Sequence, residues 1–156
     1  MCGALSSVLA FKGCIVASKS QMTGMLGVYL AAAELTRRGF IVSPTSRSAA
    51  GADLLLTDSD CQKAFSIQVK SDQTKSNFFL LGSKSRTAVS RSHVYIFVKV
   101  KRTKALGDSV SFYIVPSRKV AELAWHDGKF PNIRIDAISK YENRWSIFGA
   151  PDPVDG

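Results

Sequence analysis

Two apolar runs decide the fold: Asp53-Leu-Leu-Leu-Thr57 and Ala64-Phe-Ser-Ile-Gln-Val-Lys-Ser71. Both have the length and the apolar content of β-strands. In the second run Gln68 and Lys70 are two residues apart, so the alternation of a strand places both side chains on one face. If the two strands pair as a hairpin, Asp53 lies close to Gln68. The pattern then predicts a reaction centre with one carboxylate, one amide oxygen and one ammonium group.

These motifs belong to a longer pattern. A helical stretch from Gly27 to Phe40 comes first, and Gly51-Ala-Asp53 and Gln68-Val-Lys70 follow in that order. Over roughly residues 22 to 100, the pattern resembles the PD-(D/E)XK nuclease superfamily, in the variant where Gln replaces the second acid. The resemblance is to its restriction-endonuclease-like and Holliday-junction-resolvase-like members. It implies an α/β fold, a restriction-endonuclease-like core in which helices flank a mixed central sheet.

The resemblance implies hydrolysis of a phosphodiester bond with a divalent metal, Mg²⁺ or Mn²⁺. Hard cations prefer oxygen ligands, so Asp53 and Gln68 are the expected metal ligands. A bound metal acidifies water and neutralises charge on the phosphate oxygens. Lys70 is expected to stabilise developing charge or to orient the attacking water. The alternatives are a strand-edge Asp53 and a Lys70 that only extends its stem along the strand.

A third acid is expected from the helix, and here the sequence departs from the family pattern. Resolvase-like members carry Glu after the second Gly of Gly-x-x-Gly, where this chain has Val28. Glu34 is the acid that the helix does offer, about 9 Å further along the axis. We include Glu34 as a candidate catalytic residue. The alternative is a solvated side chain beside Arg37 and Arg38.

Charge points to a polyanionic partner. The chain has a formal net charge of +9 and an isoelectric point near 9.7, which favour DNA as the partner. Basic residues are concentrated between positions 70 and 104, where Asp72 is the one acid and Ser, Thr, Asn and Gln are interleaved. A solvated loop face is the alternative for any single residue. The candidate nucleic-acid-binding residues are Arg47, Lys75, Lys84, Arg86 and Arg91.

Periodicity and turn residues predict an α/β element order. Thr23 is the expected N-cap of a helix over 24–38, Gly39 its C-terminal stop and Ser117 the N-cap of a second helix to 125. The near-continuous apolar run at 94–98 favours a central strand buried on both faces. The expected strands are 40–43, 53–57, 64–71, 93–100 and 110–115.

The chain is expected to form one domain. With 156 residues and 46% hydrophobic content, it has room for one core. We assign 1–20 to an N-terminal extension, 21–150 to the PD-(D/E)XK-like domain and 151–156 to a frayed tail. No run is long and apolar enough to span a bilayer, so no membrane partner is expected. Three cysteines without metal-ligand spacing favour the cytoplasm.

Two functions follow as hypotheses. The first is a metal-dependent DNA endonuclease that uses Asp53, Gln68 and Lys70. The second is a non-catalytic nucleic-acid-binding or interaction module on the same fold, in which Val28 marks a decayed metal site. A homodimer is possible for the nuclease. With one small site in each chain, cutting both strands of a duplex needs either two chains or two successive cleavage events by one chain.

Overall fold

A computed structural model of the protein describes residues 17–46, 51–103, 107–127 and 130–149. Most of the predicted extension, the candidate Arg47 and the predicted tail lie outside these residues. Within the described residues, no helix is long and apolar enough to cross a membrane.

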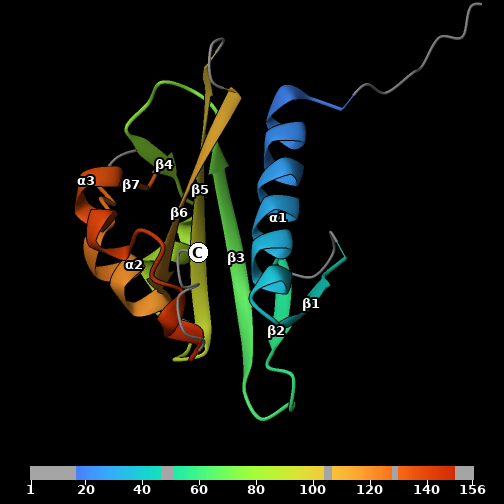
Figure 1. The fold of residues 1–156 in the computed structure, drawn as a ribbon. Coiled ribbons are helices and arrows are strands. Elements are labelled where there is room, and N and C mark those ends of the chain that lie inside the picture. The colour runs from blue at the N-terminus through green and yellow to red at the C-terminus, as the bar shows by residue number, and fades with distance from the viewer. Residues whose placement is uncertain (1–16, 47–50, 104–106, 128–129, 150–156) are drawn as a thin grey trace, which may run out of the picture.

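The centre of the molecule is a mixed five-stranded sheet (Figure 1). Three of its four strand pairs are antiparallel, and the inner pair β3–β5 is parallel. In sheet order the strands are β1 (Ile41–Pro44), β2 (Leu54–Thr57), β3 (Ala64–Asp72), β5 (His93–Thr103) and β6 (Gly107–Pro116). The predicted strands are therefore found, with the last two extended into a long hairpin.

Helices cover both faces of this sheet, as Figure 1 shows. Helix α1 (Lys19–Arg37) lies on one face. The other face carries a small sheet and short helices: β4 (Phe78–Leu80) paired with β7 (Asn132–Arg134), and α2 (Ser117–Leu123) with α3 (Ile135–Ile138). The described residues also include three short 3-10 helices: η1 (Ser83–Arg86), η2 (Ser139–Tyr141) and η3 (Trp145–Phe148).

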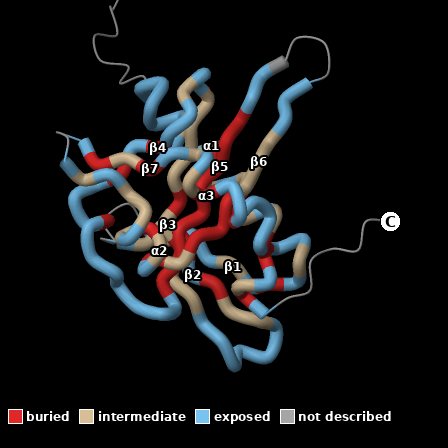
Figure 2. Tube along the Cα trace, turned by 90° about the vertical axis from the view of Figure 1, so that its left-hand side faces the viewer, coloured by how far each residue is buried: buried red, intermediate tan, exposed pale blue. Residues whose placement is uncertain are grey.

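The core has two layers, one on each side of β5. Residues of β5 alternate between them, so the strand is buried on both faces, as predicted (Figure 2). Ile96 and Val98 belong to the core layer that contains Leu35 of α1. Tyr95 and Phe97 pack with Phe79 of β4 on the opposite face. Double coverage explains why this strand is almost continuously apolar.

Helix α1 begins earlier than expected. Ser18, not Thr23, is its N-cap: the Ser18 hydroxyl accepts from the Gln21 amide at 3.2 Å, and the Gln21 side chain accepts from the Ser18 amide at 2.8 Å. The apolar periodicity that predicted the start at residue 24 is absent from the first turn. The signal present in the sequence was the capping box Ser18-x-x-Gln21. Gly39, with φ of +86°, follows the helix as expected.

Close packing of α1 on β3 depends on one glycine. A Cβ at Gly27 would lie 2.4 Å from Cβ of Ser71, so no side chain fits there. The Ser71 hydroxyl donates to the Thr23 carbonyl at 2.7 Å. These contacts hold the first half of α1 against the C-terminal half of β3.

The predicted N-cap of the second helix was also wrong. Ser117 is the first helical residue of α2, and Pro116 takes the N-cap position without a side-chain bond. The Ser117 hydroxyl instead donates to the carbonyl of Ser90 at 3.0 Å. A tertiary contact therefore uses the group that local sequence rules assign to capping.

Candidate functional site

Asp53 terminates the pairing of β2 with β3. Its amide donates to the Ile67 carbonyl at 2.7 Å, in line with the strand ladder. Its carboxylate then takes over as acceptor: Oδ2 receives the Val69 amide at 2.7 Å and the Gln68 side-chain amide at 2.5 Å. The two residues that the hairpin was expected to bring together are therefore in direct contact.

These residues line a cavity of about 380 Å³ between α1 and the edge of the sheet. Asp53, Gln68 and Lys70 form part of its wall. Beyond Leu54 the strand β2 has ended, so β3 leaves one of its edges open toward this space. The first half of α1 supplies the opposite wall, from Gln21 to Tyr29.

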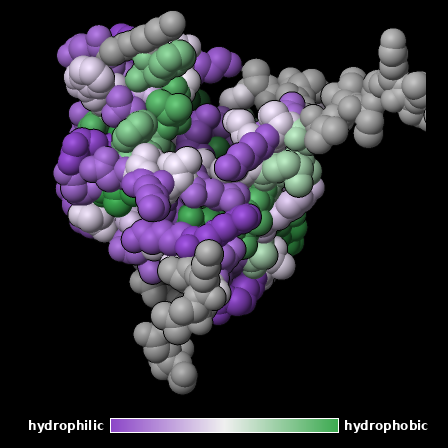
Figure 3. Space-filling model, turned by 90° about the horizontal axis from the view of Figure 1, so that it is seen from above, coloured by the Kyte–Doolittle hydropathy of each residue, from purple (hydrophilic) through white to green (hydrophobic). Residues whose placement is uncertain are grey.

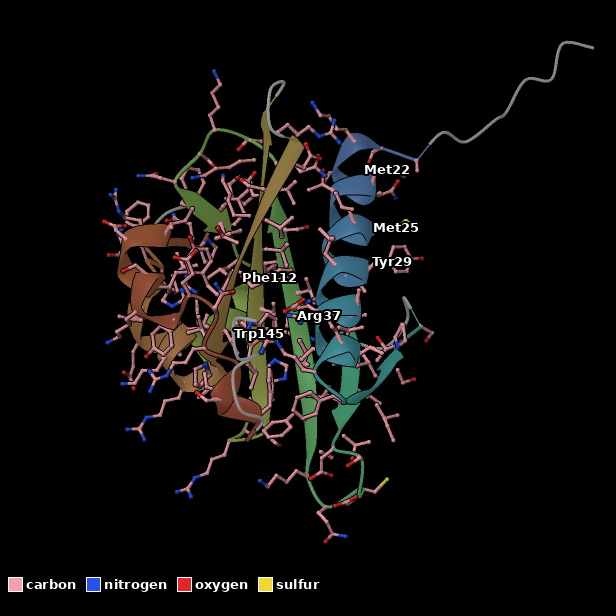
Figure 4. The ribbon with its side chains drawn as sticks, viewed as in Figure 1. Met22, Met25, Tyr29, Arg37, Phe112 and Trp145 are labelled. Atoms are coloured by element: carbon pink, nitrogen blue, oxygen red, sulfur yellow. The ribbon has the colours of Figure 1, made fainter. Side chains whose placement is uncertain are left out.

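The wall formed by α1 is partly apolar and exposed. Met25 and Tyr29 line the cavity with side chains that are 37% and 60% exposed, and Met22 one turn earlier is 54% exposed. All three lie on the side of α1 that is turned away from β3 and β5 (Figure 4). This row was not among the predicted site residues, although its spacing of three and four residues is visible in the sequence.

Val28 lines the cavity, whereas Glu34 does not. The position where the family pattern has its helix acid thus faces the candidate centre, but in this chain it is apolar. Gln21, from the first turn of α1, is the polar residue that the helix contributes to the wall. The wall contributed by α1 therefore carries no acid among the described lining residues.

Glu34 is occupied elsewhere. Its carboxylate accepts from Arg37 at 2.8 Å and from Arg38 at 3.0 Å. The Arg38 side chain is only 6% exposed, and its guanidinium carbon lies 4.5 Å from the ring centre of buried Trp145. The hydrogen bond from Arg37, together with that from Arg38, lowers the pKa of Glu34. Glu34 is the counter-ion of a buried arginine, and the structure does not bring it to Asp53.

The cavity offers oxygen ligands to a hard cation. Among the described residues, Oδ1 of Asp53 has no hydrogen-bond partner, and the Gln68 amide keeps its oxygen after its nitrogen has bonded Oδ2. Which end of the amide faces Asp53 follows from the hydrogen-bond pattern. No group of three or more His, Cys, Asp or Glu side chains suited to a metal occurs in the described part of the chain. One carboxylate and one amide oxygen fit Mg²⁺, which usually keeps several waters.

The basic candidates are spread over several surfaces. Lys84 lies beside the centre, since it lines a hollow of about 300 Å³ together with Gln68 and Lys70. Lys75 lies in the β3–β4 connection, beyond the C-terminal end of β3. Arg86 donates to the His126 carbonyl at 2.8 Å, and Arg91 precedes β5. The structure therefore brings one of these candidates, Lys84, to the same hollow as Gln68 and Lys70.

Sequence analysis missed a buried ion pair between Asp72 and Lys99. The Lys99 ammonium donates to the Asp72 carboxylate and to the carbonyls of Thr74, at 2.8 Å, and Ser76, at 2.6 Å. Burial alone would raise the pKa of Asp72, but the bonds from Lys99, Thr74 and Ser76 together lower it. Sequence offers no local signal for this pair, because its members come from neighbouring parallel strands.

The fold of this chain is similar to that of solved structures. No model of a known protein family and no curated protein matches this chain by sequence. A bacterial homing endonuclease is similar in structure, with a TM-score of 0.55 at 15% identity over 85% of this chain and 94% of that chain. A Holliday junction resolvase of the archaeon Archaeoglobus fulgidus has a TM-score of 0.48 at 14% identity, over 75% and 88% of the two chains.

The likeness to the homing endonuclease establishes the fold. The predicted α/β class, with a mixed central sheet flanked by helices, is confirmed as restriction-endonuclease-like.

Proposed function

We propose that the protein is a metal-dependent nuclease that hydrolyses DNA phosphodiester bonds at the Asp53 cavity. The observation that carries this proposal is the arrangement of three side chains. Asp53 is hydrogen-bonded to Gln68 at 2.5 Å, and Lys70 lines the same cavity. These are the residue types, in the order and the fold, that the PD-(D/E)XK pattern implies for phosphodiester hydrolysis.

Asp53 and Gln68 are the residues that would hold Mg²⁺ or Mn²⁺. When bound, the metal supplies an acidified water and neutralises charge on the scissile phosphate. The Val69 amide and the Gln68 amide fix Oδ2 of Asp53, so Oδ1 is oriented before any ligand arrives. Lys70 places a positive charge at the same wall and stabilises the negative charge that develops on phosphate oxygen.

DNA is the substrate that the charge of the chain favours. The net charge of +9 attracts a polyanion, and Lys84 borders the hollow next to Gln68 and Lys70. We further propose that two chains act together on the two strands of a duplex. A cytoplasmic location is part of the same proposal, because nothing in the cysteine pattern calls for an oxidising compartment.

Plasmid nicking tests the proposal. We expect the purified chain to nick supercoiled DNA with Mg²⁺ or Mn²⁺ and not in chelator. Asp53→Ala and Lys70→Ala should each lower the nicking rate by about 100-fold or more. Calorimetry should show that metal binding is lost in Asp53→Ala and retained in Lys70→Ala. Asp60→Asn is the matched control, because this exposed acid lies in the β2–β3 turn outside the cavity.

One observation favours a second function, a nucleic-acid-binding module without catalysis. The cavity holds a single carboxylate among its described lining residues, because Val28 stands where the family pattern has its helix acid. A metal site with one formal charge binds Mg²⁺ weakly. Salt-sensitive DNA binding with no nicking in either metal would support this second function and refute the first.

A further inference from the structure

The candidate centre is the first of three neighbouring hollows. Its cavity shares Gly24, Val69 and Lys70 with a second hollow of about 820 Å³. That hollow runs along the C-terminal end of β3 and shares Gln73, Thr74 and Ser76 with a third, of about 700 Å³. The three hollows therefore adjoin one another, and the β3–β4 loop stands between the second and the third. We call this row of hollows the groove.

The groove lies at one end of the molecule. The C-terminal end of β3, the first turns of α1 and the loop to β4 gather there (Figure 1). Seen from above, that end is covered largely by hydrophilic side chains across its middle (Figure 3). The apolar residues Phe78 and Leu80 line the second hollow with exposed fractions of 38% and 59%.

The loop beside the groove is held in place by a buried cation. Lys99 is 3% exposed, and its three donors go to Asp72 and to the carbonyls of Thr74 and Ser76. Asp72 in turn accepts from the hydroxyls of Thr74 and Ser76 at 2.8 and 2.9 Å. All donors of Lys99 are thus used inside the protein. Lys99 fixes the loop that carries Lys75 and is itself unable to bind a phosphate.

Other cations line the far hollow. Arg134 is paired with Asp136 at 2.9 Å, and Arg102 lies 3.9 Å from Asp108. Lys75 and Lys101 are exposed, and neither forms an ion pair with any described residue. We call these two lysines the distal lysines. Their charges have no acidic partner among the described residues, and both lysines line the third hollow of the groove.

We propose that the distal lysines bind the phosphate backbone of the DNA whose scissile bond lies at Asp53. The inference rests on the proposed function for its substrate class. Lys70 and Lys101 lie on the same face of the sheet, because Lys70 is in register with Phe97, four residues before Lys101. Four residues along a strand and one strand across give a separation of about 14 Å. Duplex DNA covers that distance in about four base pairs.

The separation makes the distal lysines a second anchor. Contact at a single phosphate leaves DNA free to rotate about the centre, whereas a second contact about four base pairs away fixes its direction along the groove. The β3–β4 loop is held by Lys99 on both sides of Lys75, so its backbone is already ordered before DNA binds. This order strengthens the contact of Lys75 with phosphate. The distal lysines are therefore positioning residues for substrate and do not take part in the chemistry.

The test is the salt dependence of DNA binding. Wild type and the double variant Lys75→Ala/Lys101→Ala are titrated with a labelled duplex of about 20 base pairs in chelator, so that no cleavage interferes. Each lost phosphate contact lowers the slope of log affinity against log salt by about 0.9, so we expect the slope to fall by about 1.8. Affinity should fall by about 10- to 60-fold at about 0.1 M salt.

A matched variant separates the groove from net charge. Lys63→Ala/Lys140→Ala removes two exposed lysines that form no ion pair with any described residue and lie outside the three hollows, and it should leave the slope near that of wild type. Equal losses in the two double variants would overturn the inference. Nicking by wild type is measured separately, and its absence would overturn the proposed function while the binding comparison still decides the role of the distal lysines.

Discussion

Replacing Lys99 by methionine is expected to destabilise the domain strongly. Methionine keeps the unbranched, apolar part of the side chain but removes the ammonium group, so Asp72 stays largely buried with no cation. The carbonyls of Thr74 and Ser76 lose their donor as well. Breaking a buried pair by removing one partner costs about 3–5 kcal/mol. For a domain of this size, that lowers Tm by roughly 6–20 °C.

Urea denaturation measures this cost, and Lys101→Met is the matched control. Lys101 lies two residues further along β5 on the same face, but it is exposed. We expect its replacement to change the free energy of unfolding by less than about 0.5 kcal/mol. Two results would refute the role of Lys99 in holding the β3–β4 loop. One is a loss of unfolding free energy below about 1 kcal/mol for Lys99→Met, and the other is a loss equal to that of Lys101→Met.

The stability lost in Lys99→Met is also expected to depend on pH. The pKa of Asp72 is lowered in the folded protein, so its ionised form contributes stability that is present above its ordinary value of 3.8. This contribution is lost as pH falls through the lower, folded pKa. In Lys99→Met the carboxylate of Asp72 has no cation beside it, so protonation removes an unpaired buried charge and stabilises the folded protein. The difference in stability between wild type and Lys99→Met should therefore narrow as pH falls below about 4.

Three further substitutions test other parts of the structure. Gly27→Ala places a Cβ 2.4 Å from Cβ of Ser71, so denaturation should show a loss of about 1–3 kcal/mol. Glu34→Gln leaves Arg38 without its counter-ion and should cost about 2–3 kcal/mol, while nicking by the folded protein is unchanged. Val28→Glu adds a carboxylate to the cavity wall, and calorimetry should show metal affinity raised on the order of tenfold. Unchanged affinity would place Val28 outside the metal site.

Much of the fold was predictable from local pattern. Strand alternation placed Gln68 and Lys70 on one face, and the apolar run at 94–98 identified the doubly covered strand. Gly39 marked the end of the first helix, where a positive φ is needed. The helix starts earlier than its apolar periodicity predicts, because the capping box at Ser18 adds a first turn that has no apolar face. Local rules succeed at these positions because the deciding interactions span only a few residues.

The candidate site was predictable only in part. The contact between Asp53 and Gln68 followed from hairpin pairing, which sequence order suggests. The residues that α1 contributes to the cavity could not be predicted from the sequence. They depend on how the helix is rotated against β3. Gly27 sets that rotation through its close approach to Ser71, and it brings Val28 to the wall instead of Glu34.

Local sequence pattern was enough to predict the five strands of the central sheet, the shared face of Gln68 and Lys70, and the excess of positive charge. The pairing of Lys99 with Asp72, and the position of the distal lysines in a hollow near the candidate centre, follow from the packing of the whole chain. The physical reason is the parallel pairing of β3 with β5. That register joins residues 27 positions apart in the chain, and its choice depends on the packing of two core layers that no local pattern encodes.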